Sequence, residues 1–344
     1  MGSSRLYAWV FSLTAIFSAI ALIVWDGYKT STLAQALIEL KRTRPEICYF
    51  GDSIVVTSEG ESDPRTILDI FEAKCSKSVG SIAHAAYSPM VYRDAMELMV
   101  ACGIRPKVFI LPLSTQYFTP KMTENPHNLF ILDRKRAFLQ FEGSLGQWWD
   151  FLYWRFVNSE KEMLQRHLNS EVILFGRKYQ RRSFVHTSLA IPLHYSSIEL
   201  VRHRMAPFFA YHYGETIDPQ SVALDTLKDI QRLAKQLRAK LWIYFTPINH
   251  QDARYIWRDD FDNVQKNNML FIQQLLKELK IPFVDYTELV TPDQFMDRRY
   301  VCDHLFAGGR KMLVEKICRD MKLEDDVDDR AAELEAPFSN ILEK

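Results

Sequence analysis

Short apolar runs alternate with longer amphipathic stretches along most of the chain. The short runs are rich in β-branched and aromatic residues and predict buried strands of a parallel sheet at 46–50, 80–83, 107–112, 240–245 and 282–285. Apolar residues at helical spacing predict helices at 64–75, 89–102, about 219–238, 258–279 and 308–321. This alternation predicts an α/β fold with a doubly wound, parallel five-stranded sheet.

The N-terminus has a different pattern. Residues 6–25 (LYAWVFSLTAIFSAIALIVW) form an uncharged run of twenty residues, the length that a helix needs to cross a bilayer. Arg5 precedes the run and Asp26 follows it, so the positive-inside bias places the N-terminus in the cytoplasm. A cleaved signal peptide is the alternative, but such peptides have a shorter apolar core and end on small residues, unlike Ile23-Val24-Trp25. We therefore expect a transmembrane anchor within residues 1–29.

The remainder divides into a stalk, a large domain and an insertion. Residues 30–43 predict a helical stalk, and residues 44–321 the α/β domain. Between about 119 and 217 the alternation stops, and we expect a mostly helical insertion above the carboxyl edge of the sheet. Its aromatic run at 146–158 (GQWWDFLYWRFVN) either packs the core of the insertion or faces a membrane or a membrane partner. Its basic stretch at 176–182 predicts a solvated face.

Charge and cysteine content narrow the classes of function. The chain has 43 Lys and Arg against 43 Asp and Glu, so no excess of charge favours a nucleic-acid partner. Residues 322–344 are acidic and predict a disordered tail. The five cysteines (48, 75, 102, 302, 318) lack the spacing of a zinc site, and we expect no metal and no cofactor. In an exported domain, Cys75 with Cys102 or Cys302 with Cys318 could pair.

Candidate chemistry lies where the predicted strands end. The run at 46–50 stops on Gly51-Asp52-Ser53, and a glycine at the end of a strand permits a sharp turn. Ligands of open α/β sheets bind at that edge, so Ser53 is expected at the mouth of a site. His304 precedes the last helix and is expected at the same edge. Ser53 and His304 would supply the nucleophile and the general base of acyl transfer.

The sequence leaves open which group orients the imidazole of His304. Asp303 is adjacent in sequence, but neighbouring side chains of an extended segment point to opposite faces. Asp303 could still reach the imidazole within a turn, Asp297 could return from further back, or a backbone carbonyl could hold the ring. Asn249 follows the run at 240–245 and could line the same site.

These motifs resemble a known superfamily. Gly51-Asp52-Ser53 after the first strand, with Asp303-His304 before the last helix, is similar to the SGNH (GDSL-type) hydrolases over about 44–118 and 238–321. The anchor, Ser114-Thr-Gln-Tyr-Phe118 and the insertion resemble more narrowly the D-alanyl transfer proteins of lipoteichoic acid synthesis (DltD). Membrane-tethered alginate O-acetylation proteins are similar in design. The resemblance implies a flavodoxin-like three-layer fold.

The resemblance also implies roles for residues. Ser53 matches the nucleophile, and its backbone N–H would help to bind the oxyanion. Ala83 stands where the superfamily has a glycine whose N–H is the second donor. Gln116, or failing it Ser114, would replace an asparagine side chain as the third donor. Val301 stands where the superfamily has the acid three residues before the histidine.

The resemblance finally implies a function and a location. We expect a single-pass protein of the bacterial cytoplasmic membrane, with residues 6–25 in the bilayer and the domain outside. It would be a serine O-acyltransferase or esterase that moves an acetyl or D-alanyl group to or from hydroxyls of a glycan or polyol of the cell envelope. A membrane-bound O-acyltransferase would be its partner. A stand-alone anchored esterase or lipase, and a catalytically degenerate scaffold subunit, are the alternatives.

Overall fold

A parallel sheet forms the centre of the fold. The computed structural model describes residues 31–55, 57, 61, 63–158, 160–185, 198–296 and 303–323, with Thr14, 17–18, 21–22 and 25–29 before them. Five parallel strands follow the order β2-β1-β3-β6-β7. They are β1 (Ile47–Gly51), β2 (Val79–Ala83), β3 (Val108–Leu113), β6 (Lys240–Phe245) and β7 (Phe283–Asp285). The predicted α/β fold with a five-stranded parallel sheet is confirmed.

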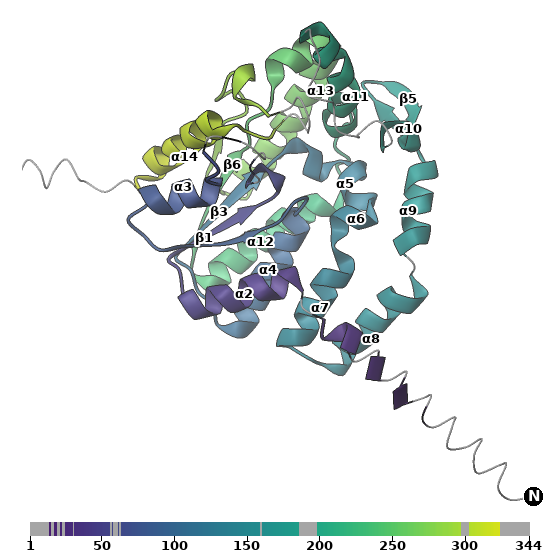
Figure 1. The fold of residues 1–344 in the computed structure, drawn as a ribbon, viewed down its shortest axis with the longest axis vertical. Helices are drawn as coiled ribbons and strands as arrows, with labels where there is room; N and C mark the ends of the chain where they lie inside the picture. The colour runs from purple at the N-terminus through teal and green to yellow at the C-terminus, as the bar shows by residue number, and fades with distance from the viewer. Residues whose placement is uncertain are drawn as a thin grey trace, which may run out of the picture.

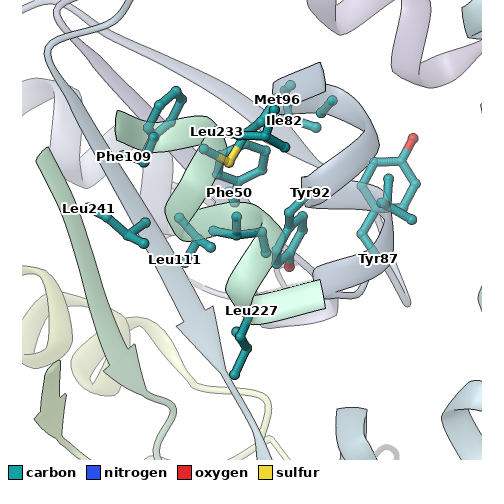
Figure 2. Packing of buried hydrophobic residues seen from close by; sticks show 14 of the residues in the cluster. Phe50, Ile82, Tyr87, Tyr92, Met96, Phe109, Leu111, Leu227, Leu233 and Leu241 are labelled. Atoms are coloured by element: carbon teal, nitrogen blue, oxygen red, sulfur yellow. The ribbon is translucent and has the colours of Figure 1, made fainter. Parts of the chain in front are cut away.

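Helices cover both faces of the sheet (Figure 1). One layer holds α2 (Thr32–Thr43), α4 (Pro89–Cys102) and α12 (Val222–Leu237), and the other holds α3 (Ile67–Lys74) and α14 (Ala307–Met321). Strand β1 is buried throughout, and its side chains alternate between the two cores. Cys48 and Phe50 pack in the first core, where Figure 2 shows Phe50 against Tyr92, whereas Ile47 and Tyr49 pack in the second.

The predicted stalk is instead part of the domain. Four apolar residues of α2 are at most 1% exposed and belong to the first core: Leu33, Ala34, Leu37 and Leu40. The side chain of Ser31 caps the helix, and the carboxylate of Asp133 accepts hydrogen bonds from the N–H groups of Thr32 (2.8 Å) and Leu33 (3.2 Å). Helix α2 is therefore a layer of the α/β fold and not a free-standing stalk.

The insertion is mostly helical, and it contains a hairpin that the sequence did not predict. Its helical elements are α5 (Pro120–Glu124), α6 (Pro126–Leu129), α7 (Ile131–Phe141), α8 (Leu145–Leu152), the π-helical turn η3 (Tyr153–Val157), α9 (Glu160–Asn169), α10 (Arg181–Val185) and α11 (Ile198–Tyr213). Strands β4 (Glu171–Leu174) and β5 (Arg177–Gln180) form an antiparallel pair. Phe175 and Gly176 join them, both with positive φ (49° and 75°), as a tight two-residue hairpin turn requires.

Two helix boundaries differ from the prediction. Helix α3 begins at Ile67 instead of residue 64, because Thr66 and Asp69 cap each other's backbone N–H groups. Helix α13 spans His250–Glu278, with a non-helical residue, Arg258, at the point where the predicted helix began. The sequence pattern therefore identified α13 from Arg258 onward and missed the turns at 250–257.

Several predictions fall wholly or partly outside the described residues. Most of the run at 6–25 lies outside them, and so does the tail from residue 324. Within the described part of the chain, no helix combines the length and the apolar character that a membrane span requires. The anchor therefore stays a prediction. Cys102 is a free thiol, so the Cys75–Cys102 bridge is not formed, and the alternative bridge involves Cys302, which is not described.

The packing of α2 can be tested with two neighbouring residues. Leu37→Ala should lower the free energy of unfolding by about 2–5 kcal/mol, because it leaves a cavity in the first core. The matched variant Ile38→Ala, at a position that is 54% exposed, should change it by less than about 0.5 kcal/mol. Urea unfolding of the full chain in detergent measures both. Equal effects would mean that α2 is a stalk after all.

Candidate active site

Ser53 lies at the carboxyl edge of the sheet, in a short turn that closes over β1. The turn is the 3-10 segment η1 (Ser53–Val55). The carboxylate of Asp52 accepts a hydrogen bond from the N–H of Ile54 (2.9 Å), and its carbonyl accepts one from the N–H of Val55 (3.3 Å). Asp52 is buried, whereas Ser53 is half-buried. The predicted position of Ser53 at the edge where ligands bind matches this geometry.

The turn requires a glycine at residue 51, because there is no room for a Cβ atom. A Cβ atom at residue 51 would lie 2.8 Å from Cγ1 of Val55 and 3.1 Å from Cβ of Ala83. Carbon atoms at those separations are inside their van der Waals contact distance, so the turn or the neighbouring strand would have to move. The glycine of the Gly-Asp-Ser triplet thus allows the chain to fold back directly beside β2.

Asp303 and His304 lie in a buried connection before α14. The N–H of Met296 donates to the carbonyl of His304, and the N–H of Phe306 donates to the carbonyl of Gln294, both at 2.8 Å. Asp303 is 5% exposed and His304 is 7% exposed. The segment before α14 is therefore held by backbone pairing to the short helix η4 (Pro292–Gln294) and the residues after it.

Arg310 joins the segments that follow Ser53 and His304. Its guanidinium is fully buried and donates to Glu61 Oε2 (2.8 Å), and to the carbonyls of Leu305 (2.7 Å), Asp63 (2.9 Å) and Arg65 (3.0 Å). The other carboxylate oxygen of Glu61 accepts from the N–H of Ala307 (3.0 Å). The loop after Ser53 and the start of α14 are consequently bound to one buried cation.

The carboxylate of Asp303 binds side chains from two other segments of the fold. Its Oδ2 accepts hydrogen bonds from Nε2 of Gln116 and from the hydroxyl of Tyr213, both at 3.1 Å. Among the described residues, its Oδ1 is buried without a hydrogen-bond partner. Burial, and after it the charge of Asp303, raises the pKa of Asp52 to about 7. The residue before Ser53 and the residue before His304 therefore interact electrostatically.

Gln116 lies in η2 (Thr115–Phe118), after β3, and its amide is held at both ends. The amide nitrogen donates to Asp303, while Oε1 lies 2.7 Å from Nδ1 of His212 and 3.5 Å from Nζ of Lys121. Nζ of Lys121 and Nδ1 of His212 are 2.5 Å apart. Burial, then Lys121, then His304 lower the pKa of His212 well below its ordinary value, so its imidazole is neutral.

A second buried pair continues from this network into the insertion. Glu215 accepts from the N–H of Lys121 (3.0 Å) and from the guanidinium of Arg181 (3.1 Å). Arg181 is 3% exposed, although the basic stretch at 176–182 predicted a solvated face; Arg177 and Lys178 of that stretch are exposed as expected. Arg181 is buried because Glu215 neutralises it.

The other residues predicted for the site have different environments. The N–H of His84, the residue after Ala83, donates to the carbonyl of Gly51 (3.2 Å), so β2 ends directly beside the Ser53 turn. Ser114 is 2% exposed. Asn249 caps α13 and bonds Asp252 through both atoms of its amide, at 3.2 and 2.9 Å. Asp297 lies outside the described residues.

Several residues of the site carry no signal in the sequence. Lys121 and Arg310 are ordinary surface residues by pattern, and their partners lie 91 and 249 positions away. Tyr213, at the end of α11, donates a hydrogen bond to Asp303. Ala86 has φ of 64°, in the left-handed region, within the turn after Ala83. In the described residues, no group of three or more His, Cys, Asp or Glu side chains could hold a metal ion.

The fold is weakly similar to the solved structures of a lipase and of esterases. No protein-family model and no curated protein matches the chain. A GDSL-like lipase from Bacteroides thetaiotaomicron is 13% identical, with a TM-score of 0.38 over 82% of this chain and 89% of that one.

Two other structures are similar to the same degree. A mutant of an acetylxylan esterase from Geobacillus stearothermophilus is 10% identical (TM-score 0.38; 81% of this chain and 95% of that one). A carbohydrate acetylesterase from Sinorhizobium meliloti is also 10% identical (TM-score 0.34; 80% and 97%). At these values nothing about the activity of this chain follows from the likeness.

The buried carboxylate of Asp52 should make stability depend on pH. Its native pKa of about 7 lies above the ordinary value of 3.8, so the folded chain keeps a proton that the unfolded chain has lost. The free energy of unfolding should therefore fall as pH rises from about 4 to about 7, by at most about 4 kcal/mol, and then level off. Asp52→Asn, which keeps an acceptor for the N–H of Ile54, should remove this slope. Urea unfolding at a series of pH values measures this slope. If the free energy of unfolding depended on pH equally in the wild type and in Asp52→Asn, the prediction would be wrong.

The lack of space at Gly51 predicts that a larger residue there destabilises the fold. Gly51→Ala should lower the free energy of unfolding by about 1–3 kcal/mol through overpacking against Val55 and Ala83. Gly146→Ala is the matched control, since its nearest heavy atom would lie 3.8 Å away within helix α8, where Ala is the better helix former. Thermal and urea unfolding compare the pair. A stable Gly51→Ala protein would show that the turn at Ser53 accommodates a Cβ atom.

Proposed function

We propose that this chain is a membrane-anchored serine O-acyltransferase or esterase of the SGNH type, acting outside the cytoplasm on hydroxyls of a cell-envelope polymer. One observation carries the proposal: Asp303, the residue before His304, lies near enough to Asp52, the residue before Ser53, for its charge to raise the pKa of Asp52, and Gln116 after β3 binds Asp303. A serine, a histidine and an amide at one edge of a parallel sheet are the side chains of acyl transfer.

The proposed roles are those that the resemblance implies. Oγ of Ser53 attacks the acyl carbonyl while His304 takes its proton, and a tetrahedral intermediate forms. The oxyanion is stabilised by backbone N–H groups at Ser53 and Ala83. When the intermediate collapses, the leaving alcohol receives the proton from His304 and the acyl group stays on Ser53. A sugar or polyol hydroxyl then accepts the acyl group in transfer, or water accepts it in hydrolysis, with His304 again as the base.

The hydrogen bond between Gln116 and Asp303 limits the role that each can have in catalysis. Nε2 of Gln116 donates to Asp303, so Gln116 reaches an oxyanion only if that hydrogen bond is exchanged. Asp303 is the neighbouring candidate for the acid that orients His304, and its Oδ2 is held by Gln116 and Tyr213. Asp297 stays the alternative acid.

The location and partner come from the sequence. The apolar run at 6–25 supports an anchor, and the charges beside it support an extracytoplasmic domain. The likeness to D-alanyl and alginate O-acetylation proteins supports an acetyl or D-alanyl group, and a membrane-bound O-acyltransferase as the donor of it. Without that partner, the same site would be a stand-alone esterase.

A specific observation favours one other function. The carboxylate of Asp303 is bound by Gln116 and Tyr213, and Val301 replaces the usual acid. A site whose acid and amide occupy each other through a hydrogen bond suits a non-catalytic scaffold subunit of an envelope assembly complex. A reactive Ser53 would support the enzyme, and an unreactive Ser53 would support the scaffold subunit.

Covalent labelling tests the proposal. The full chain in detergent should react with a fluorophosphonate probe, and Ser53→Ala and His304→Ala should abolish labelling because the nucleophile or its base is lost. Asp303→Asn and Asp297→Asn compare the two candidate acids. Ser76→Ala, at an exposed serine, is the control and should label like the wild type. Wild-type protein that stays unlabelled, also with a membrane-bound O-acyltransferase present, would favour the scaffold.

A further inference from the structure

One face of the insertion exposes an unusual amount of apolar surface. On α8 and η3 five apolar or aromatic side chains are exposed: Leu145 (90%), Trp149 (73%), Tyr153 (45%), Phe156 (62%) and Val157 (68%). They recur every three or four residues, so most of them share one side of this segment. The opposite side is occupied as well, because Phe151 is fully buried and Trp148 packs edge-on against it. The outward side of a surface helix is normally polar, and here it is not.

This face adjoins the end of the apolar run at residues 6–25. The carboxylate of Asp26 binds the guanidinium groups of Arg155 (2.8 Å) and Arg136 (3.0 Å), and Nε of Arg136 also donates to the carbonyl of Asp26 (3.0 Å). Tyr28 packs edge-on against Trp148, with 5.5 Å between ring centroids. Figure 1 shows the described residues at the end of the run emerging beside α8.

The backbone at Gly27 strengthens this attachment. A Cβ atom there would lie 2.6 Å from the ring of Trp148, so the chain lies flat on the indole. The point where the apolar run ends is thus held to α7, α8 and η3 by two ion pairs and an aromatic contact. Phe17 (67%), Leu22 (68%) and Trp25 (72%) are exposed at described positions of the run. The exposed face of α8 and η3 therefore belongs to the same elements that bind the residues where the run ends.

We propose that the face formed by Leu145, Trp149, Tyr153, Phe156 and Val157 lies in the lipid interface of the same bilayer that residues 6–25 enter. The inference rests on the anchor of the proposed function. Trp, Tyr and Phe rings are favoured at the boundary between head groups and acyl chains, and an amphipathic helix lies in that plane with its apolar side down. Arg155, 45% exposed beside the face, would meet lipid phosphates.

Such a contact would set the orientation of the catalytic domain. A domain joined to a membrane by one helix can rotate about its tether, whereas a second contact through α8 and η3 fixes its tilt. The ion pairs of Asp26 couple the two contacts rigidly. The carboxyl edge of the sheet, with Ser53, would then stay at a constant height above the bilayer.

Lipid quenching tests the proposal on the full chain. The protein is reconstituted in vesicles of phosphatidylcholine and phosphatidylglycerol, with an environment-sensitive fluorescent amino acid at Trp149 or Phe156. Lipids that carry a doxyl group near the head-group end of the acyl chain should quench roughly half of this emission or more. Ile173 is the matched control: it is 57% exposed on β4, whose partner β5 lies at the other end of the insertion (Figure 1), and its label should keep its emission.

A label at Phe17 tests the proposed anchor separately from the proposed lipid contact of α8 and η3. Quenching at Phe17 together with Trp149 and Phe156 supports both. Quenching at Phe17, with Trp149 and Phe156 no more quenched than Ile173, overturns the inference and leaves the anchor in place; the face would then fit a protein partner. Quenching at none of these positions overturns the inference and the anchor together.

Discussion

The geometry of the site depends on one buried cation. Arg310 is fully enclosed, and a guanidinium in that position must find acceptors for its N–H groups or destabilise the fold by several kcal/mol. It finds them in Glu61 and in three carbonyls that belong to the loop after Ser53 and to the connection after His304. Two segments far apart in sequence are thereby held in one arrangement, and neither can shift without leaving a charge unpaired.

The site itself is built from opposing charges with a neutral amide between them. On one side lie two buried carboxyl groups, Asp52 and Asp303, and burial, with their mutual repulsion after it, raises the pKa of Asp52 and favours a proton there. On the other side lie Lys121 and the neutral imidazole of His212. Gln116 can donate to the first group and accept from the second, which neither an aspartate nor a lysine could do. An amide side chain meets this requirement because it carries both a donor and an acceptor.

The aromatic run at 146–158 shows that one segment can hold both buried and exposed aromatic side chains. Packing against the core of the insertion and exposure to a membrane were alternatives from the sequence, because both favour Trp and Phe. In the fold, Trp148 and Phe151 turn inward while Trp149 and Phe156 turn outward. A helix places neighbours on different sides, so adjacent tryptophans have different environments. The π-helical turn η3 extends the outward face beyond α8.

The sequence by itself determined the sheet, the serine turn and the position of His304 before the last helix. Continuous apolar runs bounded by Gly, Pro and polar residues specify buried parallel strands locally, and the carboxyl ends of such strands meet at one edge. Only the tertiary structure decided that α2 is a core layer, that Asn249 is a helix cap, and that Asp303 binds Gln116 and Tyr213. Amphipathic spacing shows that a helix has an apolar side but not what covers it. Likewise, hydrogen bonds between residues up to 249 positions apart, as for Arg310 and Glu61, leave no periodic trace in the chain, because their geometry exists only once the sheet has brought both ends together.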